Sequence, residues 1–598
     1  MATQAEESAT QPLPIGDPSS VPVPVAPQEP AAIRPNPERW LDLAATPRFA
    51  IPLLLVLSVA ALFVNLGGYP LYTKGEPREA VVVLDMFRGH SLSSIILPMR
   101  AGVEIPSKPL LMHWLIALLA LVTGGVGEWT VRIPSAILAT AAVLCCYGYT
   151  RRLFNDTAAI LAAMMLLTNF QFLQAAGGSR VDITLTFFME VGFFEFLMIA
   201  EGLTQRRILL YLALAAAVLA KGPVGVVLPA AAAAVFIAVE RRWSLLGRLD
   251  LVKGAVVIAV LAGGWYLAAT IVGGRAFFDK QILSENLFTF LNHPGISRGH
   301  SHPFYYMAVA LLAGFLPWSM LLPFAAARIA RIERLRNPRL LYLVIWFAVV
   351  MVFYSLAFSK RGVYLLALYP ALAAIIGIYL AEEIAAANPP RWLRPLSLGM
   401  GVFFALAGIG GLAAALIIRV WPGLAHWPLG LFGVTAPAFI LWLSAAIAAQ
   451  RLLVVVLAGS MIAIGYMLAR PGAGIARFAT GTAIGIACLS MVANLYVLPA
   501  TGNTLGLKDF AIQMSKIVGK GHVAYLYGLN YDIAFYSDMT IPVVAIVPKD
   551  WPEYLIVGED TYKALAAREM RDYSPVLKSG ATYLDNTGQM LVVHRKAP

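Results

Sequence analysis

The sequence predicts an all-α protein that crosses a membrane many times and ends in a small soluble α/β domain. Of its 598 residues, 59% are hydrophobic and only 13% are charged, whereas soluble domains carry roughly 25% charged residues. Apolar runs recur between residues 51 and 498. Most of them reach about 18 residues, which is long enough to cross a hydrocarbon core of about 30 Å.

The distribution of charge and cysteine excludes two other classes of protein. The net charge of +12 does not indicate nucleic-acid binding, because Lys and Arg gather in short loops between apolar runs, as cytoplasmic anchors do. Cys145, Cys146 and Cys488 all lie within apolar runs, so we predict neither a disulfide framework nor a metal site for them. We expect a monomer surrounded by membrane lipids, with no nucleic-acid partner.

The first part of the chain divides into a tail, a span and a long loop. Residues 1–47 are rich in Pro, Ala, Ser and Glu, so we predict a disordered cytoplasmic tail. The membrane domain is expected over 48–499, with its first span near 51–66 and its first outer loop at 67–108. The apolar piece at 109–123 opens with Lys-Pro and is short enough to lie along the outer surface.

The basic loops give the orientation of the spans. Runs from Arg132 onward bring the number of candidate spans to about fourteen. Placing the short basic loops in the cytoplasm puts loop 67–108 and residues 272–304 outside. One run between 398 and 498 could fail to cross fully, and this parity decides the side on which the C-terminal residues lie.

Residues 500–598 are expected to form the soluble domain. Four short runs, HVAYLYG, IPVVAIV, EYLIVGED and QMLVVHRK, are typical of strands bounded by turn residues. Residues 561–570 are typical of a helix. Neither a phosphate-binding loop nor a dinucleotide-binding motif is present in this part of the sequence.

Charged residues at the outer ends of the spans are the candidate functional residues. A charge near the hydrocarbon core is energetically costly, so such residues are rare and usually have a function. Carboxylates beside Lys and Arg suit an anionic substrate, and Arg can bind a phosphate through two parallel hydrogen bonds. The candidates are Glu76, Arg78, Glu79, Lys108, Arg180, Asp182, Lys221, Arg298, His300, His302, Lys360, Arg361 and Tyr364.

Several candidates also have a purely structural interpretation. Arg78 could pair with a neighbouring glutamate on the surface, where ion pairs contribute little. Lys108 could extend to the membrane surface, and Asp182 could cap a helix. His300 and His302 have no third ligand at a recognisable spacing, so metal ligation stays open for them.

Seven ordered motifs resemble the bacterial GT-C glycosyltransferases over about residues 50–380. They are GEPREA, SKPLLMHWL, EWTVRIPSA, SRVD, LAKGPVGVVLP, HPFYYMAVALLAGFLPW and SKRGVYLLALYPALA. The nearest branch is the lipid A aminoarabinose transferase family, and protein O-mannosyltransferases are more distant relatives. The resemblance implies a GT-C fold of about 13 spans, an odd number that places the C-terminal domain in the periplasm.

The resemblance also implies an activity. Such an enzyme transfers a hexosyl or pentosyl group from a polyprenyl-phosphate carrier to an acceptor at the outer face of the bacterial inner membrane, without a nucleotide sugar. Lipid A, another glycan and a protein are all open as the acceptor.

The match departs from the family at two positions of the first outer loop. Relatives often have Asp-Glu-x-Arg where this chain has Gly-Glu-Pro-Arg, so Gly75 replaces the leading aspartate. They often have Glu-Lys-Pro-Pro where this chain has Ser-Lys-Pro-Leu, so Ser107 replaces the glutamate. That glutamate is a candidate metal ligand in relatives, so the resemblance leaves a divalent metal open as a cofactor.

The residue types and the resemblance together give an expected role for each candidate of an inverting transferase. Glu76 and Asp182 are the expected catalytic carboxylates, which position the acceptor and accept its proton. Glu76 is expected to be accessible to solvent. Arg78 and Lys108 are expected to bind the carrier phosphate and stabilise it as it leaves. The remaining phosphate-binding candidates are Lys360 and Arg361, and the other substrate-binding candidates are Glu79, Arg180, His300, His302 and Tyr364.

The alternative function is a transporter or flippase for a lipid-linked sugar, which would also need a cationic outward cavity. Many transporters contain internal repeats with broken helices at matching positions, and we find no such repeat in the sequence. A structural membrane subunit would leave the outward charges unexplained. The sequence therefore favours the transferase.

Overall fold

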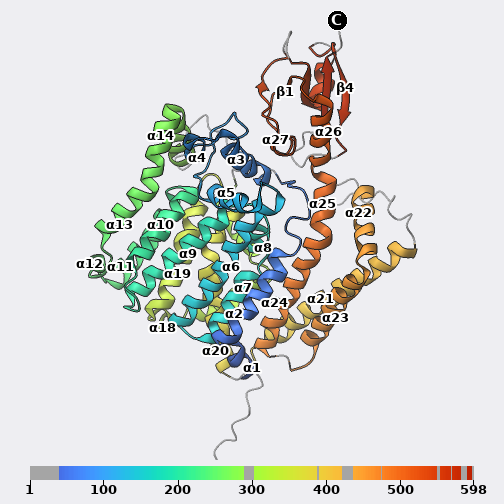
Figure 1. Ribbon diagram of the computed structural model, residues 1–598. Helices are drawn as coiled ribbons and strands as arrows, with labels where there is room; N and C mark the ends of the chain where they lie inside the picture. Colours follow the sequence, from blue (N-terminus) through green and yellow to red (C-terminus); the bar gives the residue numbers. More distant parts are fainter. Residues whose placement is uncertain are drawn as a thin grey trace, which may run out of the picture.

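The computed structural model describes residues 39–73, 75–288, 302–386, 389–420, 436–472, 474–547, 552–566, 569–580 and 589–595. Within these ranges the chain forms a helical membrane body with a small α/β domain at one end (Figure 1). The first apolar helices are α1 (Arg39–Ala45) and α2 (Pro47–Ser58), and α2 continues into the π-helical turn η1 (Val59–Phe63).

The long loop after the first apolar helices has structure of its own. It contains α3 (Gly75–Gly89) and α4 (Leu92–Ile96), and it leads into the short apolar helix α5 (Leu111–Thr123). Helix α3 is amphipathic, with Val81 and Val83 buried against Met112 and Ile116 of α5. This apolar contact fixes the loop on top of the helices that follow.

The membrane body contains the remaining helices before the C-terminal domain. The first group is α6 (Glu128–Leu153), α7 (Asp156–Leu167), α8 (Phe170–Ala176), α9 (Val181–Ala200), α10 (Arg207–Lys221), α11 (Val224–Glu240), α12 (Leu245–Arg248), α13 (Leu251–Ile258), η2 (Ala259–Gly263), α14 (Gly264–Phe277) and η3 (Phe278–Phe288). The second group is α16 (Tyr306–Gly314), η4 (Trp318–Leu321), α17 (Leu322–Ile329), α18 (Ile332–Leu335), α19 (Pro338–Leu356), η5 (Gly362–Leu368), α20 (Tyr369–Ala385), α21 (Leu393–Val420), α22 (Ala436–Ala449), α23 (Arg451–Ala469), α24 (Ile475–Val492), η7 (Ala493–Val497) and α25 (Leu498–Leu505).

Small residues allow the central helices to approach closely. Helices α7, α9 and α20 are almost entirely buried, and α20 packs along α7. At Gly377 of α20, a Cβ atom would lie 2.6 Å from the carbonyl oxygen of Ala158 on α7. A glycine is therefore needed for this contact, which is typical of helix packing in membranes.

The expected number of about 13 spans is not confirmed. Among the described residues, 8 helices are long and apolar enough to cross a membrane, or up to 10 if each of two bent pairs forms one span. Two of the apolar runs, at 157–175 and 304–325, are broken by bends of 63° and 110°. Three further apolar runs give helices of only 13, 15 and 17 residues, namely α5, α10 and α11.

The C-terminal domain is a five-stranded mixed sheet with helices on both faces. Its strands are β1 (Val523–Leu526), β2 (Val543–Val544), β3 (Tyr554–Gly558), β4 (Tyr573–Lys578) and β5 (Met590–Arg595), in the order β2-β1-β3-β5-β4. Strand β1 is parallel to β2 and β3, and β5 is antiparallel to β3 and β4. Its helices are α26 (Lys508–Val518), α27 (Tyr531–Tyr536) and α28 (Glu559–Leu565). A small C-terminal sheet was expected and is confirmed, although β4 was not among the expected strands.

This domain is attached to the first outer loop. Helix α27 packs on α3, and the Tyr536 hydroxyl accepts a 2.7 Å hydrogen bond from the Leu71 N–H. Lys508 forms a 2.7 Å ion pair with Glu128 at the start of α6. The domain and the first outer loop therefore lie on the same side of the helical body, as Figure 1 shows.

Candidate functional site

A buried ion pair anchors the first outer loop to the membrane body. Arg132 of α6 is fully buried, and it donates two hydrogen bonds to the Glu76 carboxylate, at 2.7 and 3.2 Å. It also donates to the carbonyl oxygens of Leu66, Tyr69 and Pro70 at 2.9 to 3.0 Å. One guanidinium therefore holds both the turn before α3 and the first turn of α3.

The burial of Glu76 corrects one expectation. We expected this carboxylate to be accessible to solvent, but its exposed fraction is only 3%. The reason is Arg132, which lies 56 positions away in the sequence and takes both carboxylate oxygens. A catalytic role for Glu76 stays a prediction, and the geometry found here is that of a structural ion pair.

We expect Glu76→Gln to destabilise the protein strongly. Breaking one partner of a buried ion pair leaves an uncompensated charge and costs about 3–5 kcal/mol. Thermal unfolding in detergent should show a lower Tm than the wild type. Glu553→Gln, which removes a half-exposed glutamate beside His594, is the control and should leave the Tm unchanged. An unchanged Tm together with lost activity in Glu76→Gln would instead assign Glu76 to catalysis.

A second buried carboxylate fixes Arg78. The Arg78 guanidinium donates two hydrogen bonds to Glu79 Oε1, at 2.9 and 2.7 Å. Glu79 Oε2 lies 2.8 Å from Nε2 of His113, a fully buried residue of α5. Burial alone would raise the pKa of Glu79, but Arg78 and His113 outweigh it and hold that pKa well below its usual range. Glu79 therefore stays ionised and orients Arg78.

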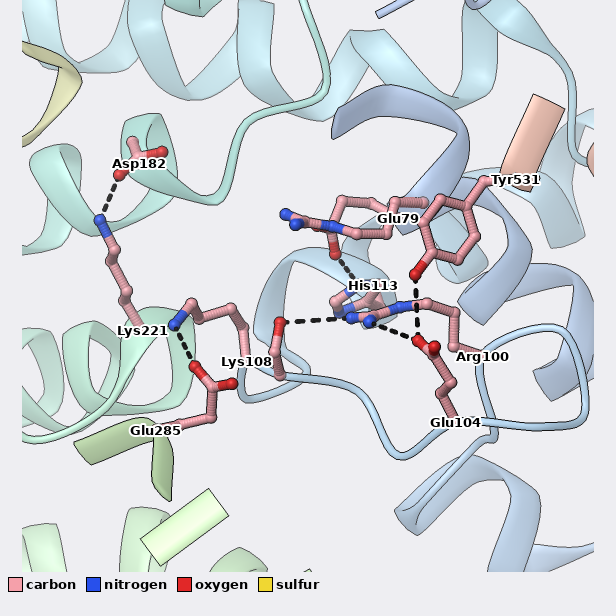
Figure 2. Close-up of polar contacts among 11 residues, drawn as sticks. Glu79, Arg100, Glu104, Lys108, His113, Asp182, Lys221, Glu285 and Tyr531 are labelled. Atoms are coloured by element: carbon pink, nitrogen blue, oxygen red, sulfur yellow. Dashed lines mark hydrogen bonds and ion pairs between the residues drawn. The ribbon is translucent and has the colours of Figure 1, made fainter. Parts of the chain in front are cut away.

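A third network connects the C-terminal domain to the segment that carries Lys108. Arg100 donates to Glu104 and to the Ser107 hydroxyl, both at 3.3 Å. Tyr531 of α27 donates to the same Glu104 carboxylate at 3.0 Å, and its ring centroid lies 5.8 Å from the Arg100 guanidinium carbon. Figure 2 shows this network beside Glu79 and His113.

Lys108 itself forms an ion pair with Glu285 of η3, at 3.2 Å. Glu285 lies 177 positions further along the chain and was not among the predicted candidates. Leu110, two residues after Lys108, packs in one apolar cluster with Leu219 of α10. The outer end of α10 therefore lies next to this segment, and α10 ends at Lys221.

Lys221 connects α9, α10 and η5 at the outer end of the body. Its ammonium donates to Asp182 Oδ1, as Figure 2 shows, and lies 4.1 Å from the centroid of the Tyr364 ring. The residue at the N-cap position of α9 is Arg180, and Asp182 forms no capping hydrogen bond there. The capping interpretation of Asp182 is therefore replaced by an ion pair.

Two of the candidate cations have side chains without a hydrogen bond or ion pair in the part of the chain that the structure describes. Among the described residues, the Lys360 ammonium makes no hydrogen bond or ion pair, although Lys360 is only 7% exposed. The half-buried Arg180 side chain also makes neither. A carboxylate partner is present for each of Arg78, Arg100, Lys108, Arg132 and Lys221. Lys360 lies just before η5, which packs against α9 and carries Tyr364.

The remaining candidates lie around this centre or outside the described residues. Arg361 is exposed, and the His302 ring stacks on Tyr306 with 4.1 Å between the ring centroids. Arg298 and His300 fall outside the described residues. Sequence reasoning missed His113, and its only signal was a single histidine within an apolar helix.

The described residues do not offer a ligand set for a metal ion. They contain no group of three or more His, Cys, Asp or Glu residues that would hold one. The Ser107 hydroxyl accepts a hydrogen bond from the cationic Arg100, which makes its surroundings unfavourable for a metal ion. A metal requirement therefore stays a prediction.

Comparisons with known proteins give consistent results. Residues 107–280 match the family model described as dolichyl-phosphate-mannose-protein mannosyltransferase. An uncharacterized protein of Aquifex aeolicus is 30% identical over 343 residues, which cover 55% of this chain and 74% of that protein. The undecaprenyl phosphate-alpha-4-amino-4-deoxy-L-arabinose arabinosyl transferase of Pseudomonas aeruginosa is 28% identical over 419 residues, which cover 65% of this chain and 73% of that enzyme.

The fold also has a solved counterpart. The crystal structure of ArnT from Cupriavidus metallidurans bound to undecaprenyl phosphate superimposes with a TM-score of 0.69 and 21% sequence identity. The match covers 94% of this chain and 100% of that one. The two proteins therefore share an overall fold.

Proposed function

Because this chain belongs to the GT-C membrane glycosyltransferase family that includes the undecaprenyl phosphate aminoarabinose transferases, we propose that it takes its sugar from a polyprenyl-phosphate carrier. The resemblance seen in the sequence is confirmed, and so is the assignment as a membrane glycosyltransferase. The alternative function as a flippase has no support in these comparisons. The acceptor is a hydroxyl or phosphate group of lipid A, another glycan or a protein.

The ammonium of Lys360, which has no hydrogen bond or ion pair among the described residues, carries the proposal. The Lys360 side chain is largely buried, and a largely buried cation without an ion-pair partner is costly, so this group is expected to meet an anion that the chain does not supply. The phosphate of a lipid-linked sugar is such an anion, and its carrier would hold it at the depth of the membrane surface. Lys360 is thus the proposed anchor of the donor phosphate.

Lys108 and Arg78 complete the proposed phosphate site. Glu79 and His113 hold Arg78 in place, so its guanidinium needs little reorganisation when the donor arrives. Lys108 pairs with Glu285 in the structure, so a donor phosphate must compete with this carboxylate. As the sugar bond breaks, these fixed cations stabilise the negative charge on the leaving phosphate.

Asp182 is the proposed base for a hydroxyl acceptor. Its carboxylate takes the proton of the acceptor hydroxyl while the acceptor oxygen forms a bond to the anomeric carbon of the sugar. The bond from that carbon to the phosphate oxygen breaks, and the polyprenyl phosphate leaves with the electron pair. Lys221 fixes the orientation of Asp182 through their ion pair. A phosphate acceptor would need no base.

We expect Glu285→Gln to improve donor binding by up to about fivefold, the effect of an ion pair worth about 1 kcal/mol. The substitution removes the charge that competes with the donor phosphate for Lys108. The measurement is the KM for a lipid-linked donor. Asp279→Asn, an exposed acidic residue on the same helix, is the control. A rise in KM for Glu285→Gln would show that Glu285 contributes to donor binding instead.

The site is proposed to face the periplasm, together with the C-terminal domain. Single cysteines at Ser93 and Lys563, in a variant that lacks the native cysteines, should react with an impermeant maleimide in intact spheroplasts. Both positions are exposed. A cysteine at Lys253, an exposed residue in the first turn of α13 on the side proposed to face the cytoplasm, should react only after lysis. Labelling at Lys563 only after lysis would contradict the proposed orientation.

Comparative mass spectrometry of cell envelopes tests the function in the cell. Lipids and glycoproteins of a deletion strain should lack one sugar substituent, and the wild-type gene should restore it. The Asp182→Asn gene should not restore it if the acceptor is a hydroxyl. An unchanged envelope in the deletion strain, under conditions in which the protein is made, would contradict the proposal.

A further inference from the structure

The first residue of α3 and the residue before α9 lie in contact. A Cβ atom on Gly75 would be 2.9 Å from Nη1 and 3.4 Å from Cζ of Arg180. The Arg180 guanidinium therefore covers the first turn of α3, at a position where the chain itself provides no side chain. The groups that surround this guanidinium decide what it can bind.

The carboxylates of Glu76 and Asp182, which lie near Gly75 and Arg180 in the sequence, each form an ion pair with another cation. Glu76 is held by Arg132, and Asp182 is held by Lys221. Among the described residues, the Arg180 side chain forms no hydrogen bond or ion pair. Tyr72 is the polar neighbour with which it interacts electrostatically, and a neutral phenol does not neutralise a guanidinium.

We propose that the Arg180 guanidinium, which packs against Gly75 at the start of α3, forms a subsite for an anionic group, a carboxylate or a phosphate, on the transferred sugar or on the acceptor. The inference rests on the proposed function and deepens it. A guanidinium binds both kinds of anion through two parallel hydrogen bonds. A substrate amine would meet like charge at this place and is disfavoured.

The position of Arg180 separates this subsite from the carrier phosphate. Arg180 lies two residues before Asp182, the proposed base, and at the same end of α9. The carrier phosphate is assigned to Lys360, Lys108 and Arg78. An anion at Arg180 is therefore a second negative group, close to the place where the acceptor loses its proton.

Two substitutions remove the subsite by different routes. Arg180→Gln removes the charge and keeps most of the side-chain length. Gly75→Asp supplies a carboxylate directly beside the guanidinium, and the flexible end of Arg180 can move to accommodate it. Arg88→Gln is the matched control, because Arg88 is an outer-loop arginine at the other end of α3 that pairs with Asp85 and Asp538.

Binding to the purified full-length protein in nanodiscs tests the inference in two arms. The donor arm uses polyprenyl phosphate alone and polyprenyl-phosphate-linked glucose, glucuronic acid and an amino sugar. The acceptor arm uses lipid A with and without its phosphates. If the anionic group is on the sugar, the wild type should bind the glucuronic acid donor about 10- to 100-fold more tightly than the glucose donor. If the group is on the acceptor, lipid A with its phosphates should bind more tightly than lipid A without them, by about the same factor. Arg180→Gln and Gly75→Asp should lose this preference, whereas Arg88→Gln should keep it.

The outcomes separate the inference from the proposed function. Loss of the preference in one arm, with binding of bare polyprenyl phosphate unchanged, supports the subsite and identifies its source. Equal weakening of all donors, including bare polyprenyl phosphate, would overturn the inference, because Arg180 would then bind the carrier phosphate. A wild type without any preference in either arm would also overturn it. A wild type that binds no carrier at all would contradict the proposed function itself.

Discussion

Replacing Lys360 by alanine is expected to lower kcat/KM for a lipid-linked donor by about 10²-fold or more, the scale seen when one preorganised group that stabilises a transition state is removed. The Tm is expected to stay the same or to rise. Lys360 has no hydrogen bond or ion pair among the described residues, so its removal breaks no polar contact, and relief of the cost of burying a charge offsets the lost packing of its methylene stem. This combination of lost activity and kept stability is typical of a residue that serves the substrate.

Two further variants define the role of Lys360. Lys360→Arg keeps the charge but changes its geometry, so we expect partial rescue, while Lys360→Gln should behave like the alanine variant. Lys563→Ala, which removes a lysine of the C-terminal domain that pairs with Glu559, is the control with unchanged activity. A clear fall in Tm for Lys360→Ala, with near-normal activity, would assign Lys360 to the fold.

The second large effect is expected for Asp182→Asn. If the acceptor is a hydroxyl, loss of the base should lower kcat by about 10²- to 10⁴-fold. Donor binding should change little, because the carrier phosphate is assigned to other residues. The measurement is transfer under saturating donor, with donor affinity determined separately by equilibrium binding.

A control separates the base from the ion pair. Lys221→Met also breaks the Asp182–Lys221 contact but leaves the carboxylate in place. We expect Lys221→Met to lose less activity than Asp182→Asn if the carboxylate itself accepts the proton. Equal losses would mean that activity depends on the Asp182–Lys221 ion pair and not on Asp182 as a base. Near-normal kcat in Asp182→Asn would indicate a phosphate acceptor.

The membrane class was predictable from the sequence because it depends on local composition. Long apolar runs and few charges are visible without any contact between distant residues. The number of spans was less predictable, because bends near Asn169 and Pro317 divide apolar runs that look continuous. Such breaks depend on how neighbouring helices satisfy the freed backbone groups.

The candidate site was predictable in its residue types and not in its pairings. Lys108, Asp182 and Lys360 were visible as outward charges within motifs. The partners of two of these residues, Glu285 and Lys221, lie 177 and 39 positions away along the chain. No local pattern encodes such distant pairings. The same reason explains why Glu76 was expected to be accessible.

The contribution of the C-terminal domain was not predictable at all. Tyr531 reaches Glu104 across 427 positions, and it belongs to a domain whose sequence shows no motif of its own. The network that it forms with Arg100 supports the segment of Ser107 and Lys108. The C-terminal domain therefore helps to position the segment that carries Lys108.

A single-turnover reaction in proteoliposomes tests the central claim most directly. The protein, in excess over a polyprenyl-phosphate donor with a labelled sugar, is mixed with envelope lipids and glycoproteins as acceptors. We predict that the label leaves the carrier and appears on an acceptor, and that free polyprenyl phosphate forms in equal amount. The Lys360→Ala protein should show neither change. Label that stays on the carrier while the carrier moves between the two leaflets would contradict a transferase and support a flippase.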